Sequence, residues 1–218
     1  MPSRLEILID LLRASDAAAM ATHSLAMSGY PYATAVAYAA DEHHRPVMLL
    51  SHLAEHTQNI LAENKASVLL SRPLGNGEMQ RVSLVGHVVP RQRPPLLAAR
   101  YRRYHPEAER FLQLGDFHLY CLEPVKIRVV GGFAQAGWLD GGKLLDAPSI
   151  SLEDEAKLLQ DISTSLPQGL ALLGVDAFGI DYVKGEARRR MRFDSGPVLA
   201  DVAAAALAKL LRNYKTWP

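Results

Sequence analysis

The feature that most constrains the fold of this chain is a series of short apolar or alternating segments, each bounded by a turn signal. Clusters of Gly, Pro, Asn and Asp, such as SGYP and PLGNGE, separate the segments, and this combination is typical of β-strands. Short strands at such close spacing predict a mainly β chain that closes into a barrel. The segments cover residues 20–24, 32–40, 46–50, 65–72, 80–89, 117–122 and 125–132.

Helical periodicity interrupts this series. Apolar residues recur at i, i+3, i+4 and i+7 from Leu5 to Leu12 and predict an amphipathic helix over 3–14. Two further helices are expected at 52–63 and, after a Pro-Pro pair, at about 96–113. The barrel is therefore expected to carry helices before, between and after its strands.

The turn cluster WLDGGKLLDAPS ends the strand-rich part, and we place a boundary there between a domain over 1–148 and a small domain over 149–218. The order of patterns in the second part predicts an α+β unit. It consists of a helix over 151–165, a second helical segment, LALLG, that ends at Gly174, a hairpin over 178–193 and a last helix over 197–213.

Composition and charge exclude several classes of protein. Lys and Arg number 24 against 23 Asp and Glu, so no bulk field favours nucleic acid or an anionic membrane surface. Cys121 is the single cysteine and excludes an internal disulfide, and no window reaches the length of a spanning helix. We expect a cytoplasmic protein without nucleic-acid or membrane partners. Five arginines are expected on a solvated or dimer-facing surface: Arg91, Arg93, Arg100, Arg102 and Arg103.

A polar stretch, SHLAEHTQN, lies between the segments at 46–50 and 65–72. If Ser51 caps a helix, the unpaired N–H groups of its first turn favour a phosphate or a propionate. The periodicity then predicts a polar stripe of His52, His56, Asn59 and Glu63 and a buried stripe of Leu53, Thr57, Ile60 and Leu61. HLAEH also matches a zinc-peptidase spacing, a match that we interpret as coincidental because the helix is short. A solvated helix face remains the other interpretation of the whole stretch.

The segment at 80–89 suggests a second polar cluster. Alternation places Arg81, Ser83, Val85 and His87 on one face and Val82, Leu84 and Val88 on the other. A cation and a hydroxyl two residues apart can bind an anion together, and Arg72 would join them if the strand over 65–72 pairs with this one. Ordinary barrel exterior is the alternative interpretation.

These segments together resemble a known family. The stretches from MATHSLAMSGYPYATAVAYAADEHHRPVMLLSHLAEHTQN, through RVSLVGHVVP, to YHPEAERFLQLGDFHLYCLEPVKIRVVGGFAQAGWL resemble the FMN-binding split-barrel superfamily that contains pyridoxamine 5'-phosphate oxidase. Within it, the chain is similar to the haem-utilisation, HugZ-like branch, over roughly residues 15 to 140 and a small C-terminal domain. The resemblance implies a homodimer of six-stranded antiparallel split β-barrels with a planar cofactor, FMN or haem, at the subunit interface.

The resemblance also implies which residues bind the cofactor. In flavin-binding relatives the phosphate position matches Ser51, His56, Thr57, Gln58 and Asn59, with Arg81 on a neighbouring strand and the ring against the strand of Tyr32 and Thr34. Arg72 and Ser83 complete the expected set through the pattern described above. In haem-binding relatives a C-terminal histidine binds the iron, and a nearby acid corresponds to Asp116.

Two positions differ from the family pattern. Gln58 stands where relatives commonly carry an arginine, so a neutral amide replaces a phosphate-binding guanidinium. All eight histidines lie before residue 119, so the C-terminal domain has no imidazole. Three functions therefore stay open: a haem-iron handling or haem-degrading protein, an FMN-dependent oxidoreductase, and a non-catalytic ligand-binding dimer.

Overall fold

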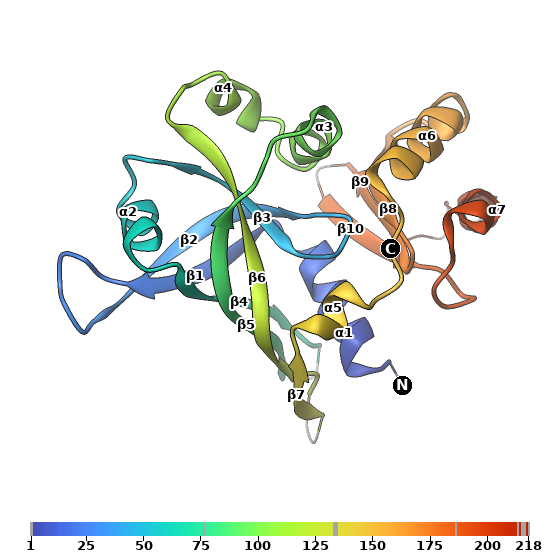
Figure 1. Cartoon of the computed structure of the whole chain (residues 1–218). Helices are drawn as coiled ribbons and strands as arrows, with labels where there is room; N and C mark the ends of the chain where they lie inside the picture. Colours follow the sequence, from blue (N-terminus) through green and yellow to red (C-terminus); the bar gives the residue numbers. More distant parts are fainter. Residues whose placement is uncertain are drawn as a thin grey trace.

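A closed six-stranded antiparallel barrel forms the first part of the chain (Figure 1). The computed structural model describes residues 2–75, 77–132, 135–185, 187–212, 214 and 217. The sheet order is β3-β2-β1-β4-β5-β6, and pairing of β3 with β6 closes the barrel. The expected mainly β split barrel followed by helices and further strands is confirmed. The barrel strands are β1 (Ala17–His23), β2 (Pro31–Ala40), β3 (Pro46–Ser51), β4 (Lys65–Pro73), β5 (Met79–Pro90) and β6 (Phe117–Val130).

The barrel interior is filled by every second side chain of these strands, because strand alternation sends the others outward. Helix α1 (Arg4–Ala14) packs its apolar side against this core, and Ser3 caps it in a capping box with Glu6. The helix expected over 3–14 is confirmed. The fully buried core residues include Leu8, Leu12, Met20, Met48, Leu70, Val82, Leu84, Ile127 and Val129.

Strand β6 is one continuous strand of 14 residues, although Glu123-Pro124 predicted a break between two strands. A bulge in the pairing with β5, at Val85/Gly86, accommodates the proline, which has no N–H for the ladder. A Cβ on Gly86 would lie 2.0 Å from the carbonyl oxygen of Glu123. Glycine is therefore required where the two strands approach. A seventh strand that the sequence did not predict, β7 (Ala136–Asp140), extends the sheet beyond β6.

Strands β2 and β3 separate early, which produces the split of the barrel. They pair over only three residues each, from Tyr38 to Ala40. Tyr101 bridges the strands beyond that point: its hydroxyl lies 3.4 Å from the Ala37 carbonyl and accepts from the Leu49 N–H at 3.3 Å. The phenol ring therefore replaces part of the missing ladder.

Tyr101 belongs to α3 (Pro95–Tyr104), which is followed by the short α4 (Ala108–Leu112). The single helix expected over 96–113 is therefore wrong. The break falls at His105, whose non-helical backbone precedes Pro106. A residue before proline disfavours the helical conformation because the proline ring clashes with it.

The C-terminal part forms a separate three-stranded sheet in the order β10-β9-β8. Its strands are β8 (Leu170–Asp176), β9 (Gly179–Lys184) and β10 (Ala187–Arg192), and its helices are α6 (Leu152–Ile162), a 3-10 turn over Ser163–Ser165 and α7 (Ala200–Arg212), after the short α5 (Gly142–Leu145). The hairpin expected over 178–193 is confirmed, while Asn213, the expected end of the last helix, lies outside the described residues.

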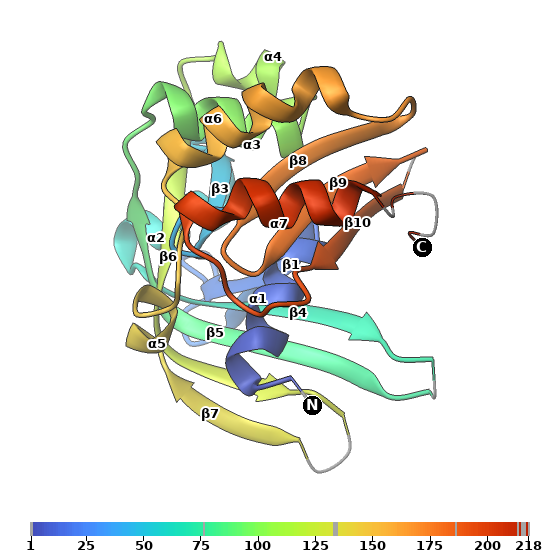
Figure 2. The ribbon, with the colours of Figure 1, turned by 90° about the vertical axis from the view of Figure 1, so that its right-hand side faces the viewer.

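The expected helical segment LALLG is wrong, because these residues form β8. Nearly every residue of β8 is buried, and a short apolar run without alternation does not distinguish a buried strand from a helix. Antiparallel pairing with β9 decides the conformation. The second sheet lies between α1 and the outer helices α6 and α7 (Figures 1 and 2).

Buried ion pairs join the second sheet to the barrel. Arg190 of β10 bonds Asp176 and Asp181 at 2.8 Å and Asp10 of α1 at 3.1 Å. Arg100 of α3 pairs with Glu155 of α6, and its side chain is only 2 % exposed. The expectation that Arg100 lies on a solvated surface is therefore wrong. The boundary at residue 148 stays a prediction, since the apolar core continues across it. Among the described residues, no helix is both long and apolar enough to cross a membrane.

Candidate functional site

The polar stretch after β3 is held by the beginning of β6. Ser51 ends β3, and its hydroxyl donates a hydrogen bond of 2.6 Å to Asp116 Oδ2. The backbone N–H of His52 donates to the Asp116 carbonyl at 2.8 Å. The closing pair β3–β6 places Ser51 opposite Phe117, so two segments 65 residues apart meet here.

Two histidines and a tyrosine lie beside this contact. His52 Nε2 lies 2.8 Å from the Tyr120 hydroxyl, and the rings of His52 and His118 are 4.4 Å apart. His52 was expected on the polar stripe of the helix, but none of the three residues belonged to the expected cofactor-binding set. In the sequence, the spacing of two residues indicates that His118 and Tyr120 share one face of β6. Only the β3–β6 pairing brings His52 to them.

Helix α2 (Glu55–Ala62) begins three residues later than predicted, and Ser51 does not cap it. Ala54 occupies the N-cap without a side-chain hydrogen bond, because Ser51 is occupied by Asp116 and by the Leu53 N–H. The predicted buried stripe is also wrong in part. Leu53 is 84 % exposed and Leu61 is 52 % exposed, whereas Asn59 is fully buried.

Asn59 has a structural position that explains its burial. Its amide oxygen accepts from the Leu25 N–H at 2.9 Å, and its amide nitrogen donates to the Thr22 hydroxyl at 3.0 Å. Both contacts fix α2 to the end of β1. Thr57 is also buried, and its hydroxyl has no partner among the described residues. Burial lowers the pKa of the neighbouring His56, against an opposing effect of Glu55.

Gln58 is turned toward the backbone. Its side-chain amide donates to the His52 carbonyl. None of the described hydrogen bonds or ion pairs of Ser51, Gln58 and Asn59 involves lysine or arginine. The position at which the family resemblance implies a phosphate therefore carries a carboxylate, Asp116, and among the described residues no cation contacts it directly.

The remaining expected residues lie on different faces. Tyr32 pairs with Thr22 and Thr34 with Met20, so both face the side of the sheet on which the core and α2 lie. Arg81 and Ser83 project to the opposite side, and Val82 and Leu84, which alternate with them along β5, are buried as predicted.

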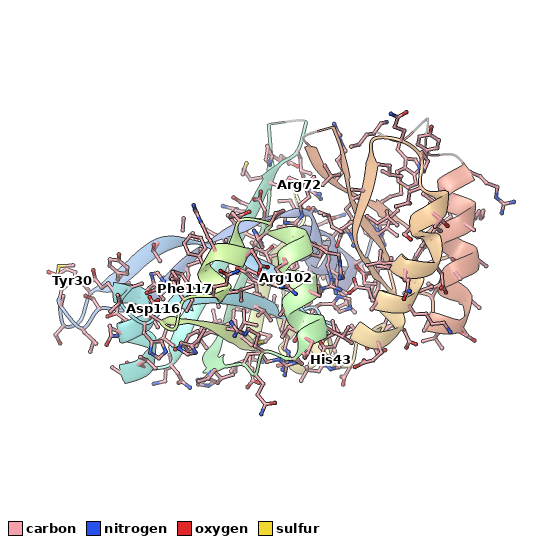
Figure 3. The ribbon with its side chains drawn as sticks, turned by 90° about the horizontal axis from the view of Figure 1, so that it is seen from above. Tyr30, His43, Arg72, Arg102, Asp116 and Phe117 are labelled. Carbon is pink, nitrogen blue, oxygen red and sulfur yellow. The ribbon has the colours of Figure 1, made fainter. Side chains whose placement is uncertain are left out.

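Arg72 does not join Arg81. It pairs with Gln80 in the ladder and donates to its amide oxygen at 2.6 Å, whereas Arg81 pairs with Ser71. Adjacent strand residues point to opposite faces, so the expected rim of Arg72 and Arg81 is wrong. Figure 3 shows Arg72 well apart from Asp116.

The outer face, by which we mean the side of β1, β2, β4 and β5 that points away from the barrel interior, is apolar over β1 and β2 and mixed in character over β4 and β5. Small side chains dominate it on β1 and β2, and two larger apolar residues, Leu69 and Val85, are 42 % and 44 % exposed. The cross-strand register aligns Ala19 with Leu69 and Leu69 with Ser83. Its alanines are Ala17, Ala19, Ala21, Ala33, Ala35 and Ala37.

An open concavity of about 380 Å³ lies on the outer face at the end of β1. Its lining combines apolar groups with an imidazole and an ammonium group, which suits a planar, mainly apolar ligand that also carries carboxylates. The lining includes Ala21, His23, Pro31, Lys65, Ser67 and Val85.

Cys121 takes no part in either site. It is buried in β6, and burial raises the pKa of its thiol to about 12. The thiolate, which is the reactive form, is therefore disfavoured at neutral pH.

A closed six-stranded antiparallel barrel, with helices packed at its ends and a split between β2 and β3, defines a protein of the FMN-binding split-barrel class. The chain belongs to the CREG β-barrel family, whose sequence model matches residues 9–144. The resemblance drawn from the sequence is thereby confirmed at the level of the superfamily.

Comparisons with individual proteins extend this result. The chain is 32 % identical over 136 residues to the chloroplastic haem oxygenase HOZ of Arabidopsis thaliana, covering 62 % of this chain but only 42 % of that protein. Atu2129 of Agrobacterium tumefaciens, a protein of unknown function, is similar in structure with a TM-score of 0.72 and 26 % identity over 94 % of both chains. A haem-binding protein of Mycobacterium smegmatis shares the fold, with a TM-score of 0.60 and 22 % identity over 100 % of this chain and 99 % of that one.

Proposed function

We propose that this protein binds haem in a groove formed where two copies of the chain meet through their outer faces. The observation that carries the proposal is the concavity at the end of β1, where an imidazole and an ammonium group border an apolar floor. Haem is planar and apolar with two carboxylates, so these residues fit its chemistry. FMN, which carries a phosphate, requires a different set of donors.

The charges around Ser51 favour haem over FMN. A phosphate at that position would meet the Asp116 carboxylate at the Ser51 hydroxyl, and Gln58 is engaged with the backbone. Like charges at close range repel, and within the part of the chain that the structure describes no cation contacts this position directly to offset the repulsion. The residues present therefore do not fit the phosphate of FMN in the manner that the family resemblance implied.

The dimer is supported by the character of the outer face. Leu69, Val85 and the row of alanines expose apolar side chains on one side of the sheet, and exposed apolar surfaces can mark interaction sites. A second copy is the partner that we propose, because a two-fold axis brings the same apolar surface to both sides of the interface. The open concavity would then be covered by the partner.

Two of the similar proteins also support the proposal of haem binding. HOZ is named as a non-canonical haem oxygenase, and its similarity extends over 136 residues of this chain. The full-length structural similarity to a haem-binding protein of Mycobacterium smegmatis is in keeping with this function. We extend only haem binding, and no reaction, from these relatives to this chain.

The experiment is a titration of the purified protein with hemin and, separately, with FMN, followed by visible absorption, with the mass measured by light scattering. We expect a Soret band that saturates at one haem per subunit, and a mass of about 48 kDa, which is twice 23.9 kDa. Saturable flavin binding without haem binding would favour the FMN-dependent oxidoreductase. Saturation with neither ligand, or a monomeric mass, would overturn the proposal.

A further inference from the structure

We infer that His23 is the residue that binds the haem iron. This inference rests on the proposed function and adds to it the ligand that the C-terminal part of the chain lacks. His23 is the last residue of β1, lies opposite Pro31 in the ladder, and borders the concavity. Its side chain is exposed, and no described hydrogen bond holds the imidazole. A ring nitrogen is therefore free to bind a metal.

Four of the seven other histidines are engaged elsewhere, and His43 and His56 lie between β2 and β3 and on α2, away from the outer face. His44 is buried between Arg13 and the Pro148 carbonyl, His105 is buried against the Tyr38 carbonyl, and His52 bonds Tyr120. Each would have to give up a contact to bind iron. His118 lies against His52 at the beginning of β6, away from the outer face.

His87 is the competitor that matters, because it lies on the same face as His23. The ladder places it opposite Lys65, on the strand beyond β4. Its Nδ1 lies 3.2 Å from the Asn64 side-chain oxygen, which turns the ring toward β4's N-terminal end. His87 does not border the concavity, so we assign the iron to His23 and use His87 as the matched control.

Lys65 supplies the positive charge that a haem propionate needs. It also borders the concavity, and its ammonium group lies 2.8 Å from Glu63. Both side chains of this pair are solvent-exposed, and exposed ion pairs add little stability. Lys65 can therefore exchange Glu63 for a propionate at small cost. A haem bound in this way would have a propionate near β4 and its iron near β1.

The test compares hemin titrations of the wild-type protein, His23→Ala and His87→Ala, each checked for dimer mass and circular dichroism. We expect His23→Ala to bind hemin at least about tenfold more weakly, since loss of even an outer partner of a metal ligand costs roughly 10- to 100-fold. The Soret maximum should shift, and added imidazole should restore both position and affinity. His87→Ala should match the wild type.

The outcomes separate this inference from the proposed function. If the wild type does not bind hemin, the proposed function fails and His23 has no iron to bind. If the wild type binds hemin and His23→Ala keeps both the affinity and the spectrum, the assignment of His23 fails while haem binding stands. Loss of hemin binding in His87→Ala but not in His23→Ala would show that His87 of β5 binds the iron and would overturn the inference.

Discussion

The hydroxyl of Ser51 donates a hydrogen bond of 2.6 Å to the carboxylate of Asp116 and thereby ties the end of β3 to the residue before β6. This contact takes the serine away from the start of α2, where it was expected to act as a cap. It also places a negative charge at the position where the family resemblance implies a phosphate. The contact therefore bears on both the fold and the choice of cofactor.

The first prediction concerns the preference for haem over FMN. The double variant Asp116→Asn, Gln58→Arg removes the carboxylate and adds a guanidinium, so FMN should bind more tightly than to the wild type by about 1.5 to 3 kcal/mol, the typical contribution of a hydrogen bond to a charged group. Isothermal titration calorimetry measures the gain. Riboflavin, which lacks the phosphate, is the control; an equal gain for riboflavin would show that the phosphate is not involved.

The second prediction concerns the dimer. Val85→Asp places a carboxylate at an exposed apolar position of the outer face, on β5, and a two-fold axis would repeat the charge in each dimer. We expect the mass from light scattering to fall to that of one chain. Leu61→Asp is the matched control, because Leu61 is similarly exposed but lies on α2. Dissociation of both variants, or of neither, would argue against the outer face as the interface.

The third prediction concerns the ion pairs that join α1 to the second sheet. Arg190→Met leaves Asp176 and Asp181 buried without their shared cation, and loss of one partner of a buried pair costs about 3 to 5 kcal/mol. Urea unfolding should show this loss in the free energy of unfolding. Arg189→Met, on the exposed side of the same strand, should change it by less than about 0.5 kcal/mol.

The fourth prediction concerns pH and His44, which is buried in the turn between β2 and β3. Arg13 can only donate, so His44 Nδ1 accepts from it at 3.0 Å and Nε2 donates to the Pro148 carbonyl at 3.1 Å. Burial lowers the pKa of His44, against opposing effects of Asp176, the Pro148 carbonyl and Asp41. The folded protein therefore holds this ring neutral.

The lowered pKa of His44 determines how the stability of the protein depends on pH. Below the ordinary histidine pKa of 6.5, the unfolded chain binds a proton at this residue and the folded chain does not. The free energy of unfolding therefore falls as pH falls, at most by about 1.4 kcal/mol per pH unit from this group. Unfolding in urea between pH 7.5 and 5.5 measures the slope. His44→Asn, which suits the positive φ of 62° at this position, should reduce the slope. The neighbouring His43→Asn should not; equal slopes in all three proteins would contradict the prediction.

Much of the barrel was predictable because its signal is local. Alternation along β5 sends Val82 and Leu84 inward and Arg81 and Ser83 outward whatever the partner strands are. The same holds for the opening helix, whose apolar spacing and Ser3 cap are contained within a few residues. The errors occurred where local signals are ambiguous. LALLG, a buried run without alternation, is an example.

The candidate site was less predictable, because its geometry depends on contacts between distant segments. Nothing within residues 46–63 indicates that Asp116 will occupy the Ser51 hydroxyl, or that Tyr120 will reach His52. Arg72 was expected beside Arg81 because strand pairing was foreseen, but a register difference of one residue places it on the other face. The free imidazole of His23 became a candidate only when the ladders placed it beside Lys65 on one concavity.

The sequence by itself thus determined the kind of most elements and the inward and outward faces of the best strands, because these depend on the spacing of apolar residues within one segment. The superfamily was identified from the resemblance of segments over roughly residues 15 to 140. The tertiary structure alone decided which segments meet: closure of β3 on β6, the bridge of Tyr101 across the split, and the buried contacts of Arg190. The physical reason is that pairing between distant strands and the burial of charged groups depend on the whole packed core, which no single segment of the chain specifies.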